Sequence, residues 1–158
     1  MISVELKKFE PGDLEKVFEI QRSAYKPLYE KYRDDDMSPY MESAEMLLRK
    51  YTRPGTVGYV FLEDGEAVGT VRIILDAERK SGRVSALGVL PRCQGRGIAQ
   101  KALLEIEAVH SEVENWYLDT ILQEEGNCRL YEKLGYRKTG KYEEIKENMT
   151  IVFYEKKK

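Results

Sequence analysis

Apolar residues along this chain recur with two periods, and turn signals separate the stretches in which each period holds. Residues 3–9 alternate between apolar and polar side chains, which predicts a half-buried strand. Pro11 and Gly12 end that pattern, and Asp13 can cap a helix whose apolar positions recur at helical spacing to about residue 25. The stretch 25–40 is rich in tyrosine and aspartate, which predicts a polar connection with some tyrosines packed beneath it.

The rest of the chain continues the same alternation. Two β-rich runs, 56–62 and 67–74, flank Asp64-Gly65, a pair that favours the positive φ angles of a tight hairpin. The other predicted elements are a helix opened by Ser43 or Pro39 and ended by Pro54-Gly55, a strand at 83–89, a helix to about His110, a strand at 116–121, a helix at 126–133 stopped by Gly135, and strands at 136–142 and 149–154. This order predicts an α/β fold, with a mixed sheet of about seven strands and helices on both faces.

Length and charge narrow the possible functions. A chain of 158 residues suits one domain, which we place at 1–158. Its 26 Lys and Arg residues against 28 Asp and Glu residues give a formal net charge of -2, which argues against a nucleic-acid partner. No apolar run approaches the roughly 20 residues that span a membrane, and the first residues do not resemble a signal peptide, so we expect a cytoplasmic protein. The two cysteines, Cys93 and Cys128, have no metal-ligand spacing and are expected to be free thiols, with no metal site.

A glycine-rich stretch follows the predicted strand 83–89 and precedes a helix. Gly95 and Gly97 lack a Cβ atom, so the backbone there can adopt unusual angles and approach a ligand closely. The helix that follows presents unpaired N–H groups and the positive end of its dipole. This arrangement predicts a site for a phosphate or pyrophosphate, although a tight turn between strand and helix is an alternative interpretation.

Two known phosphate motifs do not fit this stretch. A nucleoside triphosphatase loop needs Gly-Lys-Ser/Thr, whereas Ile98 and Ala99 follow Gly97, and the glycine spacing of a dinucleotide fingerprint is absent. The sequence Gln94-Gly95-Arg96-Gly97-Ile98-Ala99 does match Gln/Arg-x-x-Gly-x-Gly/Ala. It resembles the acyl-coenzyme A pyrophosphate loop of the GCN5-related N-acetyltransferase (GNAT) family.

A second motif lies about one strand and one helix downstream. Residues 130–135, Leu-Tyr-Glu-Lys-Leu-Gly, are similar to the Leu-Tyr-Glu-Lys-Leu-Gly-Phe block of the same family. The resemblance is close from about Arg83 to Tyr136 and rests on element order before that. It implies a GNAT-like fold and an acetyl-coenzyme A (acetyl-CoA) dependent transfer to an amine.

The resemblance assigns roles to individual residues. It implies that Tyr131 protonates the leaving thiolate, although a tyrosine packed in the core is an alternative interpretation. Asn127 lies one helical turn before Tyr131, where it could reach the pantetheine arm or simply start the helix. The residues expected to bind the donor are Leu87, Val89, Gln94, Gly95, Arg96, Gly97, Ile98, Ala99, Gln100 and Asn127.

The chain departs from the family pattern where a carboxylate often draws the proton from the amine. Ser85 occupies the corresponding strand and is too weak a base. Asp119, Glu66 or a residue of the 25–40 segment could replace that carboxylate, or the amine could arrive already neutral. The aromatic rings and carboxylates of this segment could attract a cationic amine. The candidate acceptor-binding residues are Tyr25, Tyr29, Ser85 and Asp119.

We therefore expect an N-acetyltransferase that moves the acetyl group directly from acetyl-CoA to a primary amine of a small molecule or peptide. No covalent acyl-enzyme is expected, because neither cysteine has a histidine to activate it. The alternative is an acyl-CoA-binding sensor or interaction module that has lost turnover, which the missing strand carboxylate favours. The lone His110 is expected to interact with the C-terminus of its helix, and the last strand pair could form a homodimer edge.

Overall fold

The centre of the molecule is a seven-stranded sheet with the order β1-β2-β3-β4-β5-β7-β6. A computed structural model of the chain describes residues 3–158. The strands are β1 (Glu5–Lys8), β2 (Thr56–Glu63), β3 (Glu66–Leu75), β4 (Ser81–Val89), β5 (Asn115–Ile121), β6 (Arg137–Lys146) and β7 (Met149–Lys157). Only β4 and β5 pair in parallel, and the other neighbours are antiparallel. The predicted mixed sheet of about seven strands is confirmed.

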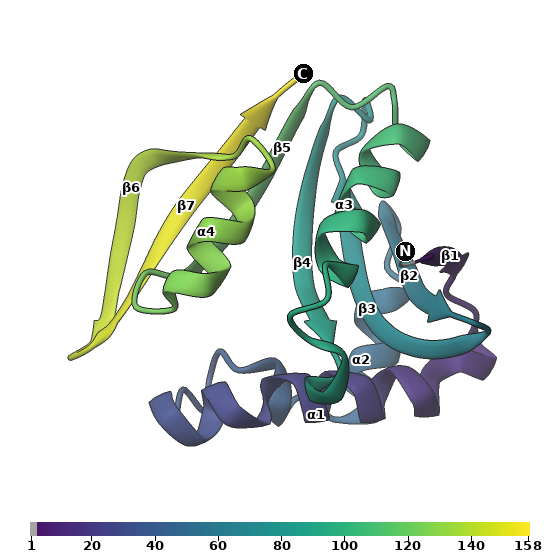
Figure 1. Cartoon of the computed structure of the whole chain (residues 1–158), viewed down its shortest axis with the longest axis horizontal. Helices are drawn as coiled ribbons and strands as arrows, with labels where there is room; N and C mark the ends of the chain where they lie inside the picture. Colours follow the sequence, from purple (N-terminus) through teal and green to yellow (C-terminus); the bar gives the residue numbers. More distant parts are fainter. Residues whose placement is uncertain (1–2) are drawn as a thin grey trace.

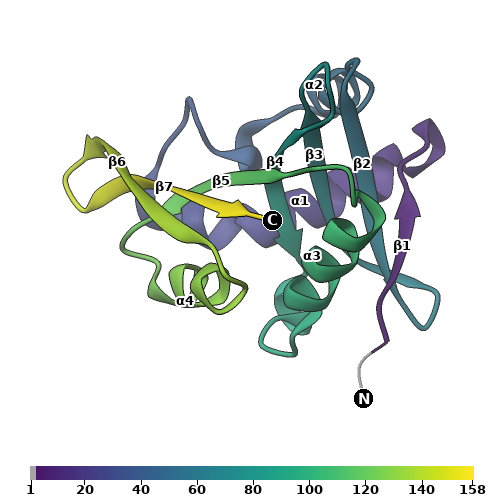
Figure 2. The same ribbon diagram turned by 90° about the horizontal axis from the view of Figure 1, so that it is seen from above.

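Four α-helices cover the two faces of the sheet (Figures 1 and 2). They are α1 (Leu14–Tyr32), α2 (Ala44–Tyr51), α3 (Ile98–Val109) and α4 (Glu125–Lys133). Helices α1 and α2 lie on one face, and α3 and α4 lie on the other (Figure 2). The predicted arrangement of helices on both faces is therefore confirmed.

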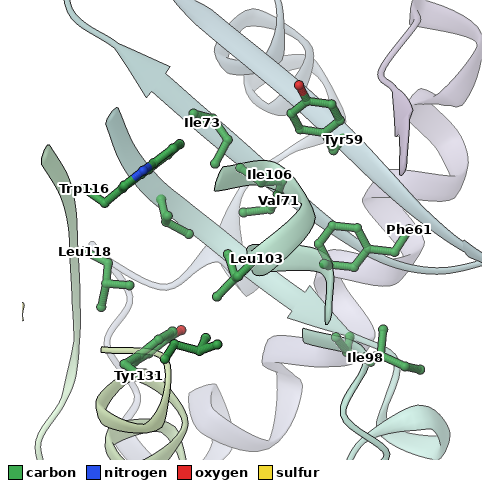
Figure 3. Packing of buried hydrophobic residues seen from close by; sticks show 14 of the residues in the cluster. Tyr59, Phe61, Val71, Ile73, Ile98, Leu103, Ile106, Trp116, Leu118 and Tyr131 are labelled. Carbon is green, nitrogen blue, oxygen red and sulfur yellow. The ribbon is translucent and has the colours of Figure 1, made fainter. Parts of the chain in front are cut away.

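The alternation along β2 divides the core between these two layers. Tyr59 and Phe61 point toward α3 and belong to the larger apolar cluster, which Figure 3 shows packed around Leu103 and Ile106. Val60 points to the other face and joins a smaller cluster with α1 and α2. The period-two pattern of β2 therefore fixes both helical layers, because successive side chains leave a strand on opposite faces.

The first helix is longer than the sequence pattern indicated. Helix α1 continues through Pro27 to Tyr32, so the prediction of a connection starting at residue 25 was wrong for its first turns. Leu28 and Tyr32 continue the apolar stripe and pack with Met149 and Ile151 of β7. This packing outweighs the backbone hydrogen bond that a proline removes from a helix.

Strands β4 and β5 separate soon after they begin. They pair only where Ser81–Arg83 lies beside Asn115–Tyr117, and beyond that point the ribbons diverge (Figure 1). Farther along, β4 also carries a bulge: its pairing with β3 shifts register, and Ala86 has a positive φ of 50°. A bulge bends a strand and redirects its side chains, so the two central strands open toward their C-terminal ends.

The turns and ends follow the sequence signals with small shifts. Asp64 and Gly65 have φ angles of 51° and 78°, as expected for the hairpin between β2 and β3, and Gly135 ends α4 at φ 99°. Strand β6 is longer than predicted, reaching Lys146, and forms one outer edge of the sheet. The homodimer expected at this edge stays a prediction. Within residues 3–158, no helix is long and apolar enough to cross a membrane.

Candidate acetyl-CoA and amine site

A cavity of about 1130 Å³ occupies the opening between β4 and β5. It is walled by α1, β4, the loop before α3, β5 and α4. All the candidate site residues except Arg96 and Tyr29 line it, namely Tyr25, Ser85, Leu87, Val89, Gln94, Gly95, Gly97, Ile98, Ala99, Gln100, Asp119, Asn127 and Tyr131. Residues that are far apart in the sequence therefore meet in one hollow.

The glycine-rich loop forms one end of this cavity. Gly95 and Gly97 have φ angles of 77° and 81°, in the left-handed region that side chains other than glycine rarely adopt. Gly97 is also the N-cap of α3, and no side chain caps the helix. The N–H groups of its first turn are consequently available to an anion, and the helix dipole favours negative charge there.

Contacts on both sides of the loop hold its shape. The Gln94 amide donates to the carbonyl of Val89 at 3.0 Å, so the loop is tied to the end of β4. The Arg96 guanidinium makes two hydrogen bonds to the Glu63 carboxylate, at 2.9 and 2.6 Å. Arg96 thus faces β2 and does not line the cavity, and its expected role in binding the donor stays a prediction.

The bulged part of β4 lies against α1. The Tyr25 hydroxyl donates to the Leu87 carbonyl at 2.6 Å, and burial raises the pKa of Tyr25, which keeps that proton on the ring oxygen. Gly88 allows this close approach, since a Cβ atom built there would lie 3.0 Å from the Ala24 Cβ. Tyr25 therefore positions the β4 backbone at Leu87, one of the residues expected to bind the donor.

Tyr131 of α4 reaches the cavity from the opposite wall. Its side chain is buried beside Leu118 at the edge of the main core (Figure 3), with the Tyr136 and Tyr154 rings at 6.1 and 6.2 Å between centroids. Burial raises the pKa of Tyr131 far above its usual value of 10.0, and the negative charge of Asp119 adds to this effect. The hydroxyl consequently keeps its proton at neutral pH and is a potential proton donor. Asn127 lies one turn earlier on the same helix and also lines the cavity.

The expected acceptor residues differ in their surroundings. Asp119 forms an ion pair with Arg83 across the diverging strands. Tyr29 is held outside the cavity, where its hydroxyl donates to Asp35 and its ring stacks on Tyr40. Glu66, one of the possible bases, is also outside the cavity and binds Arg92 at 2.7 Å.

Asp34, Glu42 and Arg72 also line the cavity; sequence reasoning included Asp34 only as part of the 25–40 segment and missed Glu42 and Arg72. One carboxylate oxygen of Asp34 is buried without a hydrogen-bond partner, and burial raises the pKa of this carboxyl group. Glu42 is buried too, with Gln21 and Lys50 as its partners. Arg72 could have been noticed as the single charge within the apolar run Val71-Arg72-Ile73-Ile74, a position that usually holds a core residue.

His110 and the cysteines lie elsewhere. His110 is buried, and its Nε2 atom lies 2.7 Å from the Tyr59 hydroxyl, so the expected role at the helix C-terminus was incomplete. Both cysteines are free, as expected, and both are buried. Within residues 3–158, no group of three or more His, Cys, Asp or Glu side chains is arranged to hold a metal ion.

The residues present fit an acyl-CoA. The uncapped N-terminus of α3 suits a pyrophosphate, and the space beside Gly97 is open, since a Cβ atom built there would meet nothing within 4 Å. The cavity continues from this loop along β4 to Tyr131, which gives room for a long ligand arm.

Comparisons with known proteins agree with this geometry. A family model described as "Acetyltransferase (GNAT) family" matches residues 14–136, whereas a search of curated proteins gives no match. One similar structure is the PaiA N-acetyltransferase of Thermoplasma acidophilum in complex with coenzyme A, with 22% identity, coverage of 99% of both chains and a TM-score of 0.76.

Two other similar structures are N-acetyltransferases as well. The spermidine N-acetyltransferase of Vibrio cholerae, in complex with CoA and spermine, has 18% identity, coverage of 96% of this chain and 94% of that one, and a TM-score of 0.75. The ribosomal-protein-S18-alanine N-acetyltransferase of Escherichia coli has 12% identity, coverage of 98% and 94%, and a TM-score of 0.77. The fold, the loop before α3 and the family match over most of the chain agree: this protein belongs to the GNAT acetyltransferase family.

Proposed function

We propose that this protein is an N-acetyltransferase that moves the acetyl group of acetyl-CoA directly to a primary amine of a small molecule or a peptide. The observation that carries the proposal is that the loop before α3 and Tyr131 of α4 line the same cavity. One similar solved structure is a spermidine N-acetyltransferase in complex with CoA and spermine, and another is a ribosomal-protein-S18-alanine N-acetyltransferase. These names indicate acetylation of an amino group, which supports transfer to an amine as the reaction.

In this proposal the donor lies along β4. The backbone N–H groups from Gln94 to Ala99 would bind the pyrophosphate, and Gln100 lies in the first turn of the helix that follows. The β4 backbone at Leu87 and Val89 would hold the pantetheine arm, with Asn127 on the opposite wall. The Tyr25 and Gln94 side chains fix two β4 carbonyls, so the strand is positioned before the donor binds.

Acetyl-CoA supplies a thioester carbon for attack by a neutral amine, and its sulfur leaves as a thiolate. Tyr131 donates its phenolic proton to that sulfur, because the phenol is protonated at neutral pH and the side chain lines the cavity. A carboxylate in the cavity takes the proton that the amine loses. We propose Asp34 for this role, because it lies in the 25–40 segment, has an unpartnered oxygen and has a raised pKa.

A binding module that has lost turnover is the second candidate. It is favoured by Ser85, which stands where the family often has a carboxylate and whose hydroxyl accepts a hydrogen bond from Arg72. Asp119, which could have replaced the missing carboxylate, already forms an ion pair with Arg83. A protein of this kind would bind acetyl-CoA without releasing thiol in the presence of amines.

The first experiment measures thiol release from acetyl-CoA with a panel of amines, for the parent protein, Tyr131→Phe and Asp34→Asn. Loss of the proton donor should lower kcat by about tenfold or more with little change in acetyl-CoA affinity, because the phenyl ring keeps the packing of α4. Asp34→Asn should lower the rate most at low pH, where less of the amine is neutral.

Calorimetry with acetyl-CoA distinguishes the two candidates. Tight binding without release of thiol by any amine would favour the binding module. Absence of binding would contradict the assignment of the loop at 94–99. A Tyr131→Phe protein that is as fast as the parent would remove Tyr131 from the mechanism.

A further inference from the structure

The cavity contains a buried cation that has no acidic partner. Arg72 of β3 is only 7% exposed and is one of the residues that line the cavity. Its Nη2 atom donates to the Ser85 hydroxyl at 3.3 Å, and its Nε atom is buried without a hydrogen-bond partner. Within residues 3–158, no carboxylate lies within ion-pair distance of its guanidinium.

The other cations of the cavity wall are either paired or exposed to solvent. Arg83 forms an ion pair with Asp119, and Lys50 lies 2.5 Å from Glu42. Arg129 and Lys133 are exposed, so water can solvate their charges. Arg72 has no acidic partner and little contact with solvent, and the Tyr51 ring, 5.9 Å from its guanidinium carbon, offers only a weak cation–π contact. An unpaired buried charge is costly unless a ligand neutralises it.

The position of Arg72 indicates which ligand could do so. Arg72 pairs with Ser85 across the sheet, four residues before the end of β4 at Val89. At the usual rise of a strand, this places it about 13 Å from the end of β4, and the glycine-rich loop at 94–99 lies beyond that end. An anion held by that loop is therefore too far away to neutralise Arg72, whereas a group bound beside Ser85 and Tyr25 is within reach.

Building on the proposed acetyl transfer, we infer that the amine acceptor also carries a carboxylate, which Arg72 binds. A planar guanidinium matches the two oxygens of a carboxylate and is always charged near neutral pH. An acceptor that bears only ammonium groups would bring further positive charge toward the buried arginine, which is unfavourable at short range. The expected acceptors are therefore amino acids or other amines with a free carboxylate.

The test compares each of a set of L-amino acids with its own amide, since the two differ in the carboxylate. In the parent protein we expect kcat/KM for an accepted amino acid to exceed that for its amide by about tenfold or more, as for other charged hydrogen bonds. The amine of an amino-acid amide is less basic than the amine of the acid, so a larger fraction of it is neutral. Basicity alone therefore favours the amide, and a preference for the acid must come from its carboxylate. Arg72→Met should remove the preference by slowing the acid form alone.

Two further variants make this comparison specific. Arg72→Lys keeps the charge but lacks the planar guanidinium, so its preference for the acid should lie between those of the parent and Arg72→Met. It also replaces Arg72→Met in the comparison if that variant does not fold. Arg49→Met changes an exposed arginine of α2 in the same way, and the preference should persist. Amides that react as well as the acids, or a preference that survives in both Arg72 variants, would overturn the inference while leaving the acetyltransferase intact.

A binding measurement separates this inference from the proposed function. N-acetylated amino acids and their amides are titrated by calorimetry into the protein saturated with CoA. Tighter binding of the acid forms by the parent but not by Arg72→Met supports the carboxylate site, even if no amine releases thiol. Equal binding of both forms by the parent would exclude it.

Discussion

His110 shows how burial changes the role of a single titratable residue. It follows the last turn of α3 and is 6% exposed. The Tyr59 hydroxyl lies 2.7 Å from the His110 Nε2 atom, and the centroids of the Trp116 and His110 rings are 6.3 Å apart. Burial lowers the pKa of His110, and the nearby Glu112 carboxylate offsets only part of this effect. The side chain is therefore a neutral partner in the core at neutral pH.

This pKa shift predicts a pH-dependent stability. Because the folded state binds the proton less readily than the unfolded chain, the contribution of His110 is complete above the ordinary histidine pKa of about 6.5 and declines as the pH falls below it. His110→Gln removes the titration, so its stability should decline less than that of the parent between pH 8 and pH 5.5. Urea unfolding at the two pH values measures this difference, and equal declines in both proteins would contradict it.

The partner of His110 is also a residue that no local pattern could have predicted. The sequence places the histidine at the end of its helix, which is correct, but Tyr59 lies 51 positions earlier. Arg72 was missed for a related reason. Its charge stands out within an apolar strand of the sequence, but only the three-dimensional arrangement shows that this position opens into the cavity.

At the scale of elements, the strongly periodic segments were predicted well and the segment 25–40 was not. Pro27 normally marks the end of a helix, yet α1 continues because Leu28 and Tyr32 pack against β7. The end of the helix is secured from a distance by Lys146, whose Nζ atom donates to the carbonyls of Tyr32 and Arg33. Such tertiary contacts override local signals, and they come from residues more than a hundred positions away.

The loop before α3 gives a prediction that separates backbone strain from ligand binding. At Gly97 a Cβ atom would meet nothing within 4 Å, so Gly97→Ala costs only the strain of a positive φ, about 1 to 2 kcal/mol. We expect it also to weaken acetyl-CoA binding about tenfold, because relaxing that angle moves the N–H groups at the start of α3.

Gly140 offers the matched control. It has a φ of 94°, an equally open surrounding, and a position in β6, outside the cavity. Gly140→Ala should lose similar stability in urea unfolding while keeping the parent affinity for acetyl-CoA in calorimetry. If the two variants bind acetyl-CoA equally well, the loop is an ordinary turn.

At the scale of the whole molecule, the order of the elements along the chain and the mixed sheet were predictable, but the opening between β4 and β5 was not. The glycine-rich motif lies before a helix and the motif at 130–135 lies on a helix and its end, as predicted, and in the structure the loop and Tyr131 line the same cavity. The separation itself depends on where the parallel pairing stops, after Arg83 and Tyr117, and on the bulge near Ala86. Neither feature has a period or a spacing that marks it in one sequence.

The opening leaves strands β1–β4 joined to β5–β7 only by the short parallel pairing of β4 with β5. Contacts across the cavity therefore matter more for holding the two parts of the sheet together. Glu124, the N-cap of α4, uses its side chain to accept from the Tyr32 hydroxyl at 2.5 Å and from Lys31 Nζ at 2.7 Å. It therefore joins the end of α1 to the start of α4. Burial alone would raise the pKa of Glu124, but these two hydrogen bonds lower it below its ordinary value of 4.5.

We expect Glu124→Ala to destabilise the fold by about 1 to 2 kcal/mol, because one charged acceptor of two hydrogen bonds is lost at a partly solvated site. Hydrogen exchange should quicken in the last turn of α1 and the first turn of α4 and stay unchanged in α3. Since the folded-state pKa is lowered, the parent holds this advantage above pH 4.5 and loses it as the pH falls through the folded-state pKa.

The adjacent Glu125→Ala is the control for this contact, because its carboxylate is exposed and its ion pair with Arg129, at 3.8 Å, lies within one helix. It should change stability by no more than a few tenths of a kcal/mol, about the value of an exposed pair on a helix. Faster exchange in both helix ends for Glu124→Ala alone would show that this residue couples the two walls of the cavity. Equal exchange in the two variants would assign the rigidity of the cavity to the sheet alone.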